Sequence, residues 1–415
     1  MSKNILIIGG GIIGLSSAYY LQKEGHQVTV VDQSNLDSGA SYVNAGYLSP
    51  SHLIPLSAPG VMKKGLKWMF NPVSPLYIKP RFDPDFLRWS WAFNKSCNQK
   101  HVEKAAPVIR DISVLSQELM TDIKRGDGFT FHYDKKGLFM LCQTEKMLEE
   151  EVKIAEYAKE LGLVAKEVNQ DEIKLMEPNA KINAIGAAYF ECDHHSTPHE
   201  FMTELKTHLT NADVKIFSNE KVEDIKIKNG KIDLVKTSKQ TFNVDEVVMA
   251  AGSWSGILAK KLGIKLLLQA GKGYRINTEK ATGITIPAIL AEAKAAVTPM
   301  NGFTRFAGTM EIAGINHNIN KVRVDAIAKA AAQYYPDIEL SQAEKDDAAC
   351  GLRPVSPDGL PYIGRSKKCN NLTIAAGHAM MGWSMSTATG KLVSEIISEQ
   401  KPSLELEPFS PDRKF

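Results

Sequence analysis

The sequence contains few cysteines, and they lie far apart. The five are Cys97, Cys142, Cys192, Cys350 and Cys369, and no two form a CxxC pair. An odd, scattered set is typical of free thiols in a reducing compartment and argues against a disulfide framework. We therefore expect a cytoplasmic protein.

An excess of charge of either sign is also missing. The 50 Lys and Arg residues are nearly balanced by 47 Asp and Glu residues, which gives a net charge of +3, and no block of Lys or Arg occurs. Nucleic-acid-binding proteins usually carry such a block or patch. We therefore expect no nucleic-acid partner.

Long apolar runs are scarce, and the one candidate lies near the N-terminus. Residues 4–21 follow Lys3 and could pass for a signal peptide, but their glycines fit a phosphate-binding turn that cleavage would remove. No other stretch is long and apolar enough to span a bilayer. Because 415 residues exceed the usual size of one domain, we expect two domains around one cofactor.

The N-terminal region contains a dinucleotide-binding motif. The sequence Gly9–Gly14 is a GxGxxG between an apolar run that predicts a strand and a run that predicts a helix, and a second β-branched run ends at Asp32. In this motif Gly9 permits the tight turn, Gly11 lets the backbone approach a pyrophosphate, and Gly14 allows close packing of helix and strand. The Asp32 carboxylate can bond a ribose diol, and an acid there argues against NADP.

The turn alone does not distinguish FAD from NAD, but the middle of the chain helps. Residues 247–252 predict a strand that ends in small residues, as a nearby cofactor requires. Residues 222–237 alternate around Asn229-Gly230 and predict a hairpin with a type I′ turn, similar to the small β-meander of flavoproteins. Each feature is also compatible with an ordinary core strand and a surface hairpin.

A group of acidic, Cys and His residues at 191–195, with His199, raises the possibility of a metal site. Thr197 followed by Pro198 and Glu200 instead predicts the start of a helix, with Thr197 as N-cap. Ligands at adjacent positions also fit tetrahedral coordination poorly. We expect no metal.

Several further motifs occur in a fixed order along the chain. After Gly9–Gly14 and Asp32 come Gly39–Gly46, a Pro- and Trp-rich run from Ser57-Ala58-Pro59-Gly60 through Lys67-Trp68 to Asp83-Pro84, Ala251–Trp254, Gly351–Pro354 with Pro357–Gly359, and Gly377-His378 with Gly382–Ser384. Taken together, they resemble the D-amino-acid oxidase/glycine oxidase (DAO) flavoprotein family, and most closely its D-amino-acid dehydrogenase branch.

The resemblance implies an α/β fold with a GR2-type, Rossmann-like FAD-binding domain and an inserted substrate domain built on a large, mostly antiparallel sheet. We expect residues 1–50, 145–262 and 346–415 in the first domain and 51–144 and 263–345 in the second. Non-covalent FAD is expected, because no His or Cys is placed as in covalently linked members. The expected cofactor-binding residues are Gly9, Gly11, Ile12, Ile13, Gly14, Asp32, Gln33, Ser41, Asn44, Ala45, Gly46, Val222, Ala251, Gly252, Trp254, Gly377, Gly382, Trp383 and Ser384.

The activity that the resemblance implies is oxidative deamination of a small D-amino acid, including the D-proline or 4-hydroxy-D-proline type, by hydride transfer from the α-carbon to flavin N5. An alternative is a glycine/sarcosine-type oxidase that uses O₂ and releases H₂O₂. A third possibility is a non-catalytic nucleotide-binding or assembly protein.

Four residues are candidates for the substrate site. Arg353, in Gly-Leu-Arg-Pro, matches the family's carboxylate-binding arginine, and an Arg fork suits a carboxylate. Arg305, between two Phe residues, is a second candidate, or it faces solvent. Tyr274 lines the pocket or belongs to the core. His378 is a proton relay or has a structural role beside the cofactor.

The segment Pro55–Phe93 mixes aromatic and basic residues. Phe86, Trp89 and Phe93 fall on one helical face, and aromatics with cations suit a membrane interface. The branch that the chain resembles donates electrons to a quinone, so we expect a quinone-type acceptor and peripheral contact with the cytoplasmic face of the inner membrane. Alternatively, these aromatics pack the substrate domain. The set comprises Trp68, Phe70, Tyr77, Phe82, Phe86, Trp89, Trp91 and Phe93, with Lys63, Lys64, Lys67, Lys79, Arg81 and Arg88 interleaved.

Overall fold

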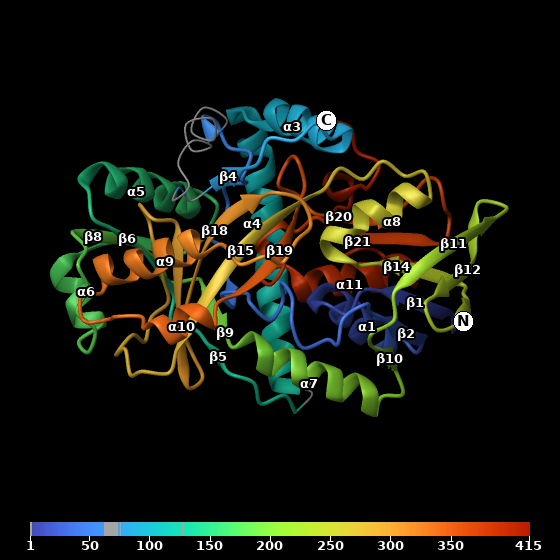
Figure 1. Ribbon diagram of the computed structural model, residues 1–415, viewed down its shortest axis with the longest axis horizontal. Helices are drawn as coiled ribbons and strands as arrows, with labels where there is room; N and C mark the ends of the chain where they lie inside the picture. Colours follow the sequence, from blue (N-terminus) through green and yellow to red (C-terminus); the bar gives the residue numbers. More distant parts are fainter. Residues whose placement is uncertain (1, 62–73, 75, 127) are drawn as a thin grey trace.

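The folded protein contains two main sheets, which lie side by side. A computed structural model, shown in Figure 1, describes residues 2–61, 74, 76–126 and 128–415. One sheet, which we call the parallel sheet, lies on the right of Figure 1, and the other, which we call the large sheet, lies on the left. The site described below lies between them.

The parallel sheet contains the strand of the dinucleotide motif. In the described part of the chain it has six strands in the order β10-β2-β1-β14-β21-β20, and β20 alone runs antiparallel to its neighbour. Because β1 is central, its apolar run Ile5 to Ile8 is buried on both faces. The strands are β1 (Asn4–Ile8), β2 (Gln27–Val31), β10 (Lys215–Phe217), β14 (Glu246–Met249), β20 (Tyr362–Arg365) and β21 (Leu372–Ala376).

Helices cover one face of the parallel sheet, and a β-meander together with α8 covers the other. Apolar residues of α1 and α11 share a cluster with Ile5 and Ile7, whereas the meander packs on Leu6 and Ile8. These elements are α1 (Ile12–Lys23), α7 (Pro198–Asn211), α8 (Ser255–Lys261) and α11 (Ser386–Ile397), with β11 (Val222–Lys228), β12 (Lys231–Thr237) and β13 (Thr241–Asn243), and the short 3₁₀ turns η1 (Gly252–Trp254), η2 (Ala379–Met381) and η3 (Glu407–Phe409).

The large sheet is mostly antiparallel, as expected. Among the described residues it has nine strands, eight in the order β19-β15-β18-β17-β16-β6-β8-β7 and β4 beside β18; only β16–β6 and β18–β4 are parallel pairs. Its strands are β4 (Leu76–Ile78), β6 (Leu138–Cys142), β7 (Ala165–Asn169), β8 (Gly186–Phe190), β15 (Gln269–Thr278), β16 (Ala288–Leu290), β17 (Ala295–Met300), β18 (Phe303–Ile312) and β19 (Ala349–Val355).

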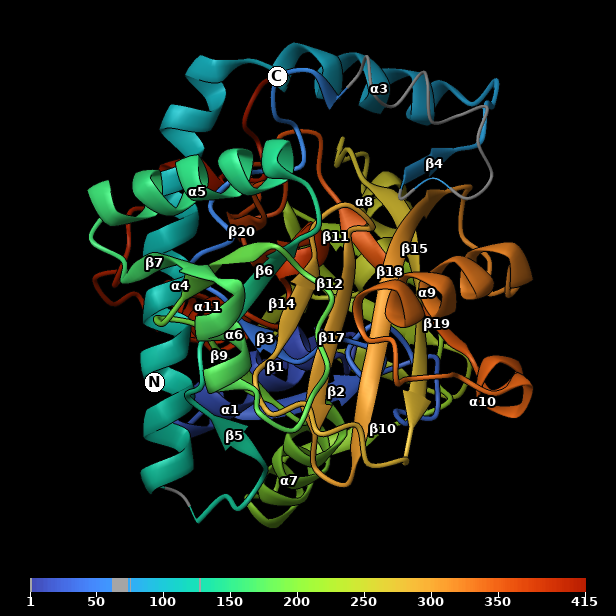
Figure 2. The same ribbon diagram turned by 90° about the vertical axis from the view of Figure 1, so that its left-hand side faces the viewer.

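Helices surround the large sheet, and one long helix joins it to the rest. Figure 2 shows α5, α6 and α9 around the strands and α3 above them. The long helix α4 packs against α11, and a small sheet of β3, β9 and β5 lies nearby. The bounds are α3 (Pro84–Ser96), α4 (Gln99–Gly126), α5 (Glu145–Glu160), α6 (Gln170–Met176), α9 (Lys321–Tyr334), α10 (Gln342–Asp346), β3 (Tyr47–Leu48), β5 (Tyr133–Asp134) and β9 (His194–Ser196).

Sheet membership differs from the predicted domain division in two places. Residues 145–190 and 346–355 were expected in the nucleotide-binding part, but β7, β8 and β19 belong to the large sheet. An apolar run marks a strand without saying which sheet it joins, because its partners lie far away in the sequence. The division into two domains itself stays a prediction.

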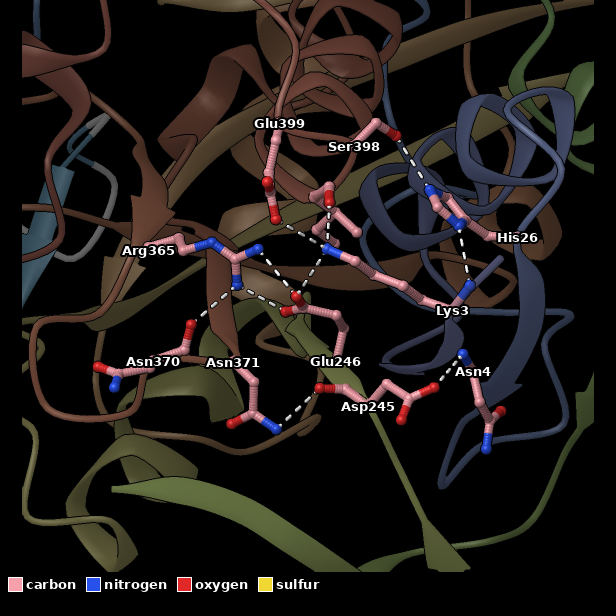
Figure 3. A network of polar contacts seen from close by, with 11 residues as sticks. Lys3, Asn4, His26, Asp245, Glu246, Arg365, Asn370, Asn371, Ser398 and Glu399 are labelled. Carbon is pink, nitrogen blue, oxygen red and sulfur yellow. Dashed lines mark hydrogen bonds and ion pairs between the residues drawn. The ribbon is translucent and has the colours of Figure 1, made fainter. Parts of the chain in front are cut away.

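A polar network holds the chain together at the amino end of the parallel sheet. Figure 3 shows Glu246, at the start of β14, between Arg365 and Lys3. The Arg365 guanidinium donates to both carboxylate oxygens at 2.6 and 2.9 Å, and Lys3 Nζ lies 3.3 Å from Oε1 and 2.7 Å from the Ile397 carbonyl oxygen. The network therefore links β1, β14, β20 and the end of α11.

The predicted aromatic face forms on α3, but it faces the protein. Phe86, Trp89 and Phe93 are buried in one cluster, and Trp89 Nε1 donates to the Val355 carbonyl oxygen at 2.9 Å. This face packs against other parts of the protein and is therefore not available to a membrane. The predicted residues Lys63, Lys64, Lys67, Trp68 and Phe70 lie outside the described residues. Of the helices described, none has the length and apolarity that crossing a bilayer requires.

Candidate active site

A large cavity lies between the two sheets. It has a volume of about 1370 Å³, and its wall includes both the glycine turn after β1 and Arg353 of β19. A pocket for one small molecule usually measures about 300–1000 Å³, so this cavity has room for more than a small amino acid.

The glycine turn has the close contacts that the motif predicts. Gly9 has a φ of 111°, and a Cβ added to it would lie 2.4 Å from the Ala250 carbonyl oxygen. A Cβ at Gly14 would lie 1.8 Å from the Gly9 carbonyl oxygen. A Cβ at Gly11 would meet only Ser41 Oγ, at 3.4 Å, among the described atoms. Gly9 and Gly14 therefore allow close packing of the backbone, while Gly11 leaves the N-terminus of α1 open to an anion from the cavity.

Asp32 lies at the end of β2, where the sequence placed it. Its Oδ2 accepts a hydrogen bond from the Gly10 N–H at 2.7 Å, and its Oδ1 accepts from the Ser34 N–H at 2.7 Å and from the Ser34 hydroxyl at 2.6 Å. These bonds fix the carboxylate on the cavity wall beside Gln33. It is thus held in one orientation, in which the free lone pair of Oδ2 can accept a bond from a ribose.

Most predicted cofactor residues line this cavity. Three do not: Gly14, Gly46 and Gly377 instead allow close packing, since an added Cβ would lie 2.1 Å from the Ser196 carbonyl oxygen at Gly46 and 2.8 Å from the Tyr362 ring at Gly377. Those that line the cavity are Gly9, Gly11, Ile12, Ile13, Asp32, Gln33, Ser41, Asn44, Ala45, Val222, Ala251, Gly252, Trp254, Gly382, Trp383 and Ser384.

The loop at 382–384 is anchored by side-chain hydrogen bonds. Ser384 Oγ donates to the Tyr47 carbonyl oxygen at 2.7 Å and accepts from the Ser49 N–H at 3.1 Å. Trp383 Nε1 donates to Ser196 Oγ at 2.9 Å, so its ring fills the core beneath the loop. Because α11 begins directly afterwards, the positive end of its dipole lies close to this part of the wall.

His378 is held in its neutral form. Its ring is buried, and burial lowers its pKa to about 3. The Nε2 atom lies 2.9 Å from Thr389 Oγ1, and Nδ1 has no hydrogen-bond partner in the described part of the chain. A ring that stays neutral cannot carry a proton as a cation, so this environment supports the structural role rather than the relay.

Arg353 points along the large sheet into the cavity. A Cβ added to Gly273, on the neighbouring strand β15, would lie 2.2 Å from both Nη1 and Nη2, so the guanidinium lies flat over this glycine. Its Nη1 donates to the Thr309 carbonyl oxygen of β18 at 2.7 Å. Burial lowers its pKa to about 10, which leaves it charged at neutral pH. No described acidic residue forms an ion pair with it.

The other two substrate candidates are already engaged with protein groups. Arg305 does not line the cavity; its Nη1 donates to the carbonyl oxygens of Tyr42 at 2.9 Å and Asn44 at 2.6 Å, and burial lowers its pKa to about 9. It supports the loop that forms the wall. Tyr274 lines the cavity, but its hydroxyl donates to Glu311 at 2.9 Å. Burial, together with this bond, raises the Tyr274 pKa.

Some residues of the wall were missed by the sequence analysis. His52 is half-buried on the cavity wall, and burial lowers its pKa to about 4. Beside it, Ser51 donates from its N–H and its hydroxyl to Asp193, which is fully buried and whose pKa burial raises to about 7. Thr309 was also missed. No periodic pattern or motif marks these residues, because only tertiary packing brings them to the cavity.

Part of the group considered as a metal site does come together with residues from elsewhere. His132, Asp134 and His195 can each bring one ligand atom within 4.8 Å of the others. Asp134, however, already pairs with Lys136 at 3.6 Å and with His132 at 3.5 Å. A cation would have to displace the lysine, so we assign no metal role to this group.

The chain is similar to known proteins over nearly its whole length. Residues 4–396 match the family described as "DAO: FAD dependent oxidoreductase". In sequence, the chain is 30% identical over 398 residues to a D-amino acid dehydrogenase of Helicobacter pylori strain J99, with 95% of each chain covered. It is 28% identical over 416 residues to a D-amino acid dehydrogenase of Vibrio atlanticus strain LGP32, with 98% of each covered.

Solved structures share the fold. A glycine oxidase from Geobacillus kaustophilus superposes with a TM-score of 0.77 at 22% identity and covers 100% of this chain and 99% of its own. An L-proline dehydrogenase from P. horikoshii superposes with a TM-score of 0.74 at 21% identity and covers 99% and 97%. The predicted fold class is confirmed.

Proposed function

Since this chain belongs to the DAO family of FAD-dependent oxidoreductases, we propose that it is a D-amino-acid dehydrogenase that oxidises the amine-bearing carbon of a small D-amino acid. Two relatives at 28–30% identity are named D-amino acid dehydrogenase, which supports this substrate class. Proline-type D-amino acids are included among the proposed substrates, with a quinone-type acceptor.

The proposal rests mainly on the environment of Arg353. A guanidinium without an ion-pair partner among the described residues faces the same cavity as the dinucleotide turn. Buried charges normally have a partner, so an unpaired cation in a ligand cavity marks a site for an anionic ligand. The planar fork of arginine suits a carboxylate, as every α-amino acid carries.

The residues of the cavity fit FAD. The glycine turn, the fixed Asp32 carboxylate and the loop at 382–384 would hold its pyrophosphate, ribose and ring ends respectively. When bound, FAD supplies the acceptor for the hydride of the oxidised carbon. The chain's own part is positioning: Arg353 would fix the carboxylate and so the α-carbon, and the apolar wall of Leu56, Leu76 and Met310 would exclude water.

The test is anaerobic bleaching of the protein-bound flavin by single amino acids. We expect D-amino acids, with D-proline and 4-hydroxy-D-proline in the panel, to bleach the flavin, and their L-enantiomers to leave it oxidised. Bleaching by L-amino acids alone, or by glycine and sarcosine alone, would contradict the proposed substrate. Peroxide formed in step with substrate loss in air would contradict the quinone-type acceptor.

An exposed patch on α3 supports peripheral membrane contact. On the side of the helix opposite its buried face, Leu87 and Trp91 are 54% and 63% exposed, and Phe82, just before the helix, is fully exposed. Lys95 Nζ lies 5.1 Å from the centre of the Trp91 ring. Arg88 is also exposed, and its guanidinium pairs with Asp85 at 3.3 Å. Apolar side chains flanked by cations suit an anionic lipid surface. We propose this patch as the contact with the cytoplasmic face of the inner membrane.

Co-sedimentation with vesicles of anionic phospholipid tests the patch. We expect the holoenzyme to bind and to be released by salt, and the double variant Leu87→Gln/Trp91→Gln to stay in solution. Leu175→Gln is a matched control, because Leu175 is an apolar residue that is 80% exposed and belongs to α6, not to the patch on α3. Equal binding of the wild type and the double variant would eliminate the patch as the contact.

A further inference from the structure

His52 brings an unbonded ring nitrogen to the wall of the cavity. The residue lines the cavity and is half-buried. Its Nδ1 atom lies 3.4 Å from Ser51 Oγ, on the side of the protein. Its Nε2 atom is not buried and has no hydrogen-bond partner in the described part of the chain. Nε2 is therefore the nitrogen that a ligand in the cavity can reach.

The hydrogen bonds behind His52 decide which ring nitrogen carries the proton. Ser51 Oγ donates its single proton to Asp193 Oδ2 at 2.5 Å, so toward His52 this oxygen can only accept. In the neutral ring the proton therefore lies on Nδ1, and Nε2 keeps a free lone pair. His52, Ser51 and Asp193, which we call the relay, thus connect the cavity with a fully buried carboxylate.

The segment that carries His52 is attached to the large sheet close to Arg353. The Tyr47 hydroxyl donates to the Val297 carbonyl oxygen of β17 at 2.9 Å. Burial and then the charge of Lys294, which directly precedes β17, lower the pKa of His52. On the adjacent strand β18, a carbonyl oxygen accepts a hydrogen bond from Arg353. Because adjacent strands are about 4.8 Å apart, His52 and Arg353 border the same part of the cavity.

We propose that His52 takes a proton from the ammonium group of the substrate and passes it through Ser51 to Asp193. This inference rests on the proposed function, because a hydride leaves the α-carbon only when the lone pair of the nitrogen is free. The N–H bond of the ammonium group breaks and an N–H bond forms at His52 Nε2. At the same time Nδ1 gives its proton to Ser51 Oγ, and the Ser51 hydroxyl gives its own proton to the carboxylate.

The step leaves the amine neutral, His52 neutral with its proton on Nε2, and Asp193 protonated. No electrons are transferred in it. After the product leaves, the proton returns to water in the cavity by the same route, which restores the relay for the next substrate.

Asp193 is a suitable destination for the proton. Burial raises its pKa to about 7, and groups that exchange protons in catalysis work best when their pKa lies near the working pH. His52, with a pKa of about 4, binds a proton too weakly to keep it. The histidine therefore transfers the proton, and the carboxylate stores it.

The other titratable groups around the relay favour the same destination. Lys294 pairs with Glu151 of α5 at 3.1 Å, and its charge disfavours a lasting positive charge on the relay. Cys192 and Tyr47 lie close to Asp193, and burial raises the pKa of both, so they stay neutral at pH 7. Among these groups, the Asp193 carboxylate is the one that can take up a proton near neutral pH.

The rate of anaerobic flavin reduction at different pH values tests the relay. The substrate is the D-amino acid of the panel above that bleaches the wild-type flavin fastest. The wild-type rate should fall below about pH 7, where Asp193 is already protonated, and change little above it. His52→Gln keeps a polar side chain but cannot take up the proton. Its rate at pH 7 should be about 10²- to 10⁴-fold lower.

Raising the pH should restore the rate of His52→Gln by about tenfold per pH unit, because more of the free amino acid is then neutral before it binds. Propionate, which has a carboxylate but no amine, should bind this variant within about threefold of the wild-type dissociation constant, read from the flavin absorbance spectrum. Ser51→Ala and Asp193→Asn interrupt the relay behind His52 and should show the same altered pH profile. FAD content and melting temperature verify that each variant is folded.

His101→Gln is the matched control. His101 is half-buried on α4, lies 2.8 Å from the Asp358 carbonyl oxygen through Nε2 and does not line the cavity, so its variant should keep the wild-type pH profile. A wild-type profile in His52→Gln, or a loss of rate that no pH restores, would overturn the inference while the proposed function stands. A wild-type profile in both Ser51→Ala and Asp193→Asn would overturn the relay as well. A wild-type flavin that no D-amino acid bleaches would overturn the proposed function itself.

Discussion

Arg353 is the residue on which substrate binding is expected to depend most. We predict that Arg353→Lys and Arg353→Met retain FAD but lose substrate affinity, because lysine cannot present a planar pair of donors and methionine presents none. Loss of one partner of a desolvated charge pair costs about 2–5 kcal/mol, which is roughly a 30- to 4000-fold loss in kcat/KM. Wild-type kcat and KM in Arg353→Met would contradict this role.

Gly273 offers an independent test of the same site. A Cβ there would lie 2.2 Å from Nη1 and Nη2 of Arg353, and these atoms are the far end of a flexible side chain. We therefore expect Gly273→Ala to fold and bind FAD normally but to displace the guanidinium and weaken substrate binding at least tenfold, about 1.4 kcal/mol. Steady-state KM together with the melting temperature measures this. A variant that loses stability but keeps its KM would show that Gly273 serves packing alone.

Asp193 should make stability depend on pH. Burial raises its pKa to about 7, whereas a carboxyl in the unfolded chain has a pKa of about 3.9. Between these values the folded state binds more protons, so the free energy of unfolding falls as pH rises from about 4 to about 7. Asp193→Asn should therefore gain stability relative to the wild type across this window in urea unfolding. The exposed Asp233 provides the control Asp233→Asn, and parallel curves for all three proteins would contradict the prediction.

Single residues of the site could be predicted from the sequence only where a motif constrains them. Gly9, Asp32 and Arg353 belong to local motifs whose backbone or chemistry is specific, and each lines the cavity. Arg305 lies in an equally suggestive context, yet it supports the loop behind the wall. Thr309 carries no local signal, because its conformation arises from the register between two strands.

At the scale of elements, the local sequence was enough to predict turns and helix starts. It was not enough to predict which sheet each strand joins. The hairpin around Asn229-Gly230 forms with φ values of 51° and 73°, as a type I′ turn requires. The helix predicted after Thr197 forms as well, but the Thr197 hydroxyl bonds the Asn301 N–H at 2.9 Å instead of capping the helix. Tertiary partners thus redirected a side chain without changing the element.

The network around Glu246 should stabilise the parallel sheet without affecting the site. Glu246 lies at the amino end of β14, whereas Ala250 and Ala251, past the other end, line the cavity. Glu246→Ala removes the carboxylate that Arg365 and Lys3 share and leaves Arg365 with the Asn370 carbonyl oxygen and Lys3 with Glu399 and the Ile397 carbonyl oxygen. We therefore expect the free energy of unfolding to fall by about 1–3 kcal/mol. Urea unfolding measures this, and the dissociation constant of FAD should not change. Weakened FAD binding without loss of stability would contradict the assignment.

At the scale of the whole molecule, the cavity joins segments that are distant in the sequence. Its wall draws on the turn after β1, the loop at 39–45, the meander, the strands β15, β18 and β19, and the loop at 379–384. A ligand that contacts all of them binds the folded chain and not the unfolded one. FAD should therefore stabilise both sheets together, by about 2.7 kcal/mol at a concentration 100 times its dissociation constant.

The family and its cofactor could be predicted because the motifs recur in a fixed order along the whole chain, and the match over residues 4–396 confirms both. The division into domains was harder to predict, because the chain crosses between the two sheets several times. Composition changes little at these crossings, so no linker marks them.

Asp32→Ala should separate FAD binding from folding. The carboxylate accepts bonds from Gly10 and Ser34 at the end of β2, and loss of its bonds to a ribose should cost about 1.5–3 kcal/mol of FAD affinity. In the variant, the melting temperature should begin to rise only at FAD concentrations about 10- to 160-fold higher than in the wild type. Above that concentration it should rise as steeply as in the wild type, because the rest of the cavity is intact. Asp37→Ala is the control, since Asp37 is exposed and does not line the cavity. If Asp32→Ala and the wild type gave the same melting temperatures at every FAD concentration, Asp32 would not bind the cofactor.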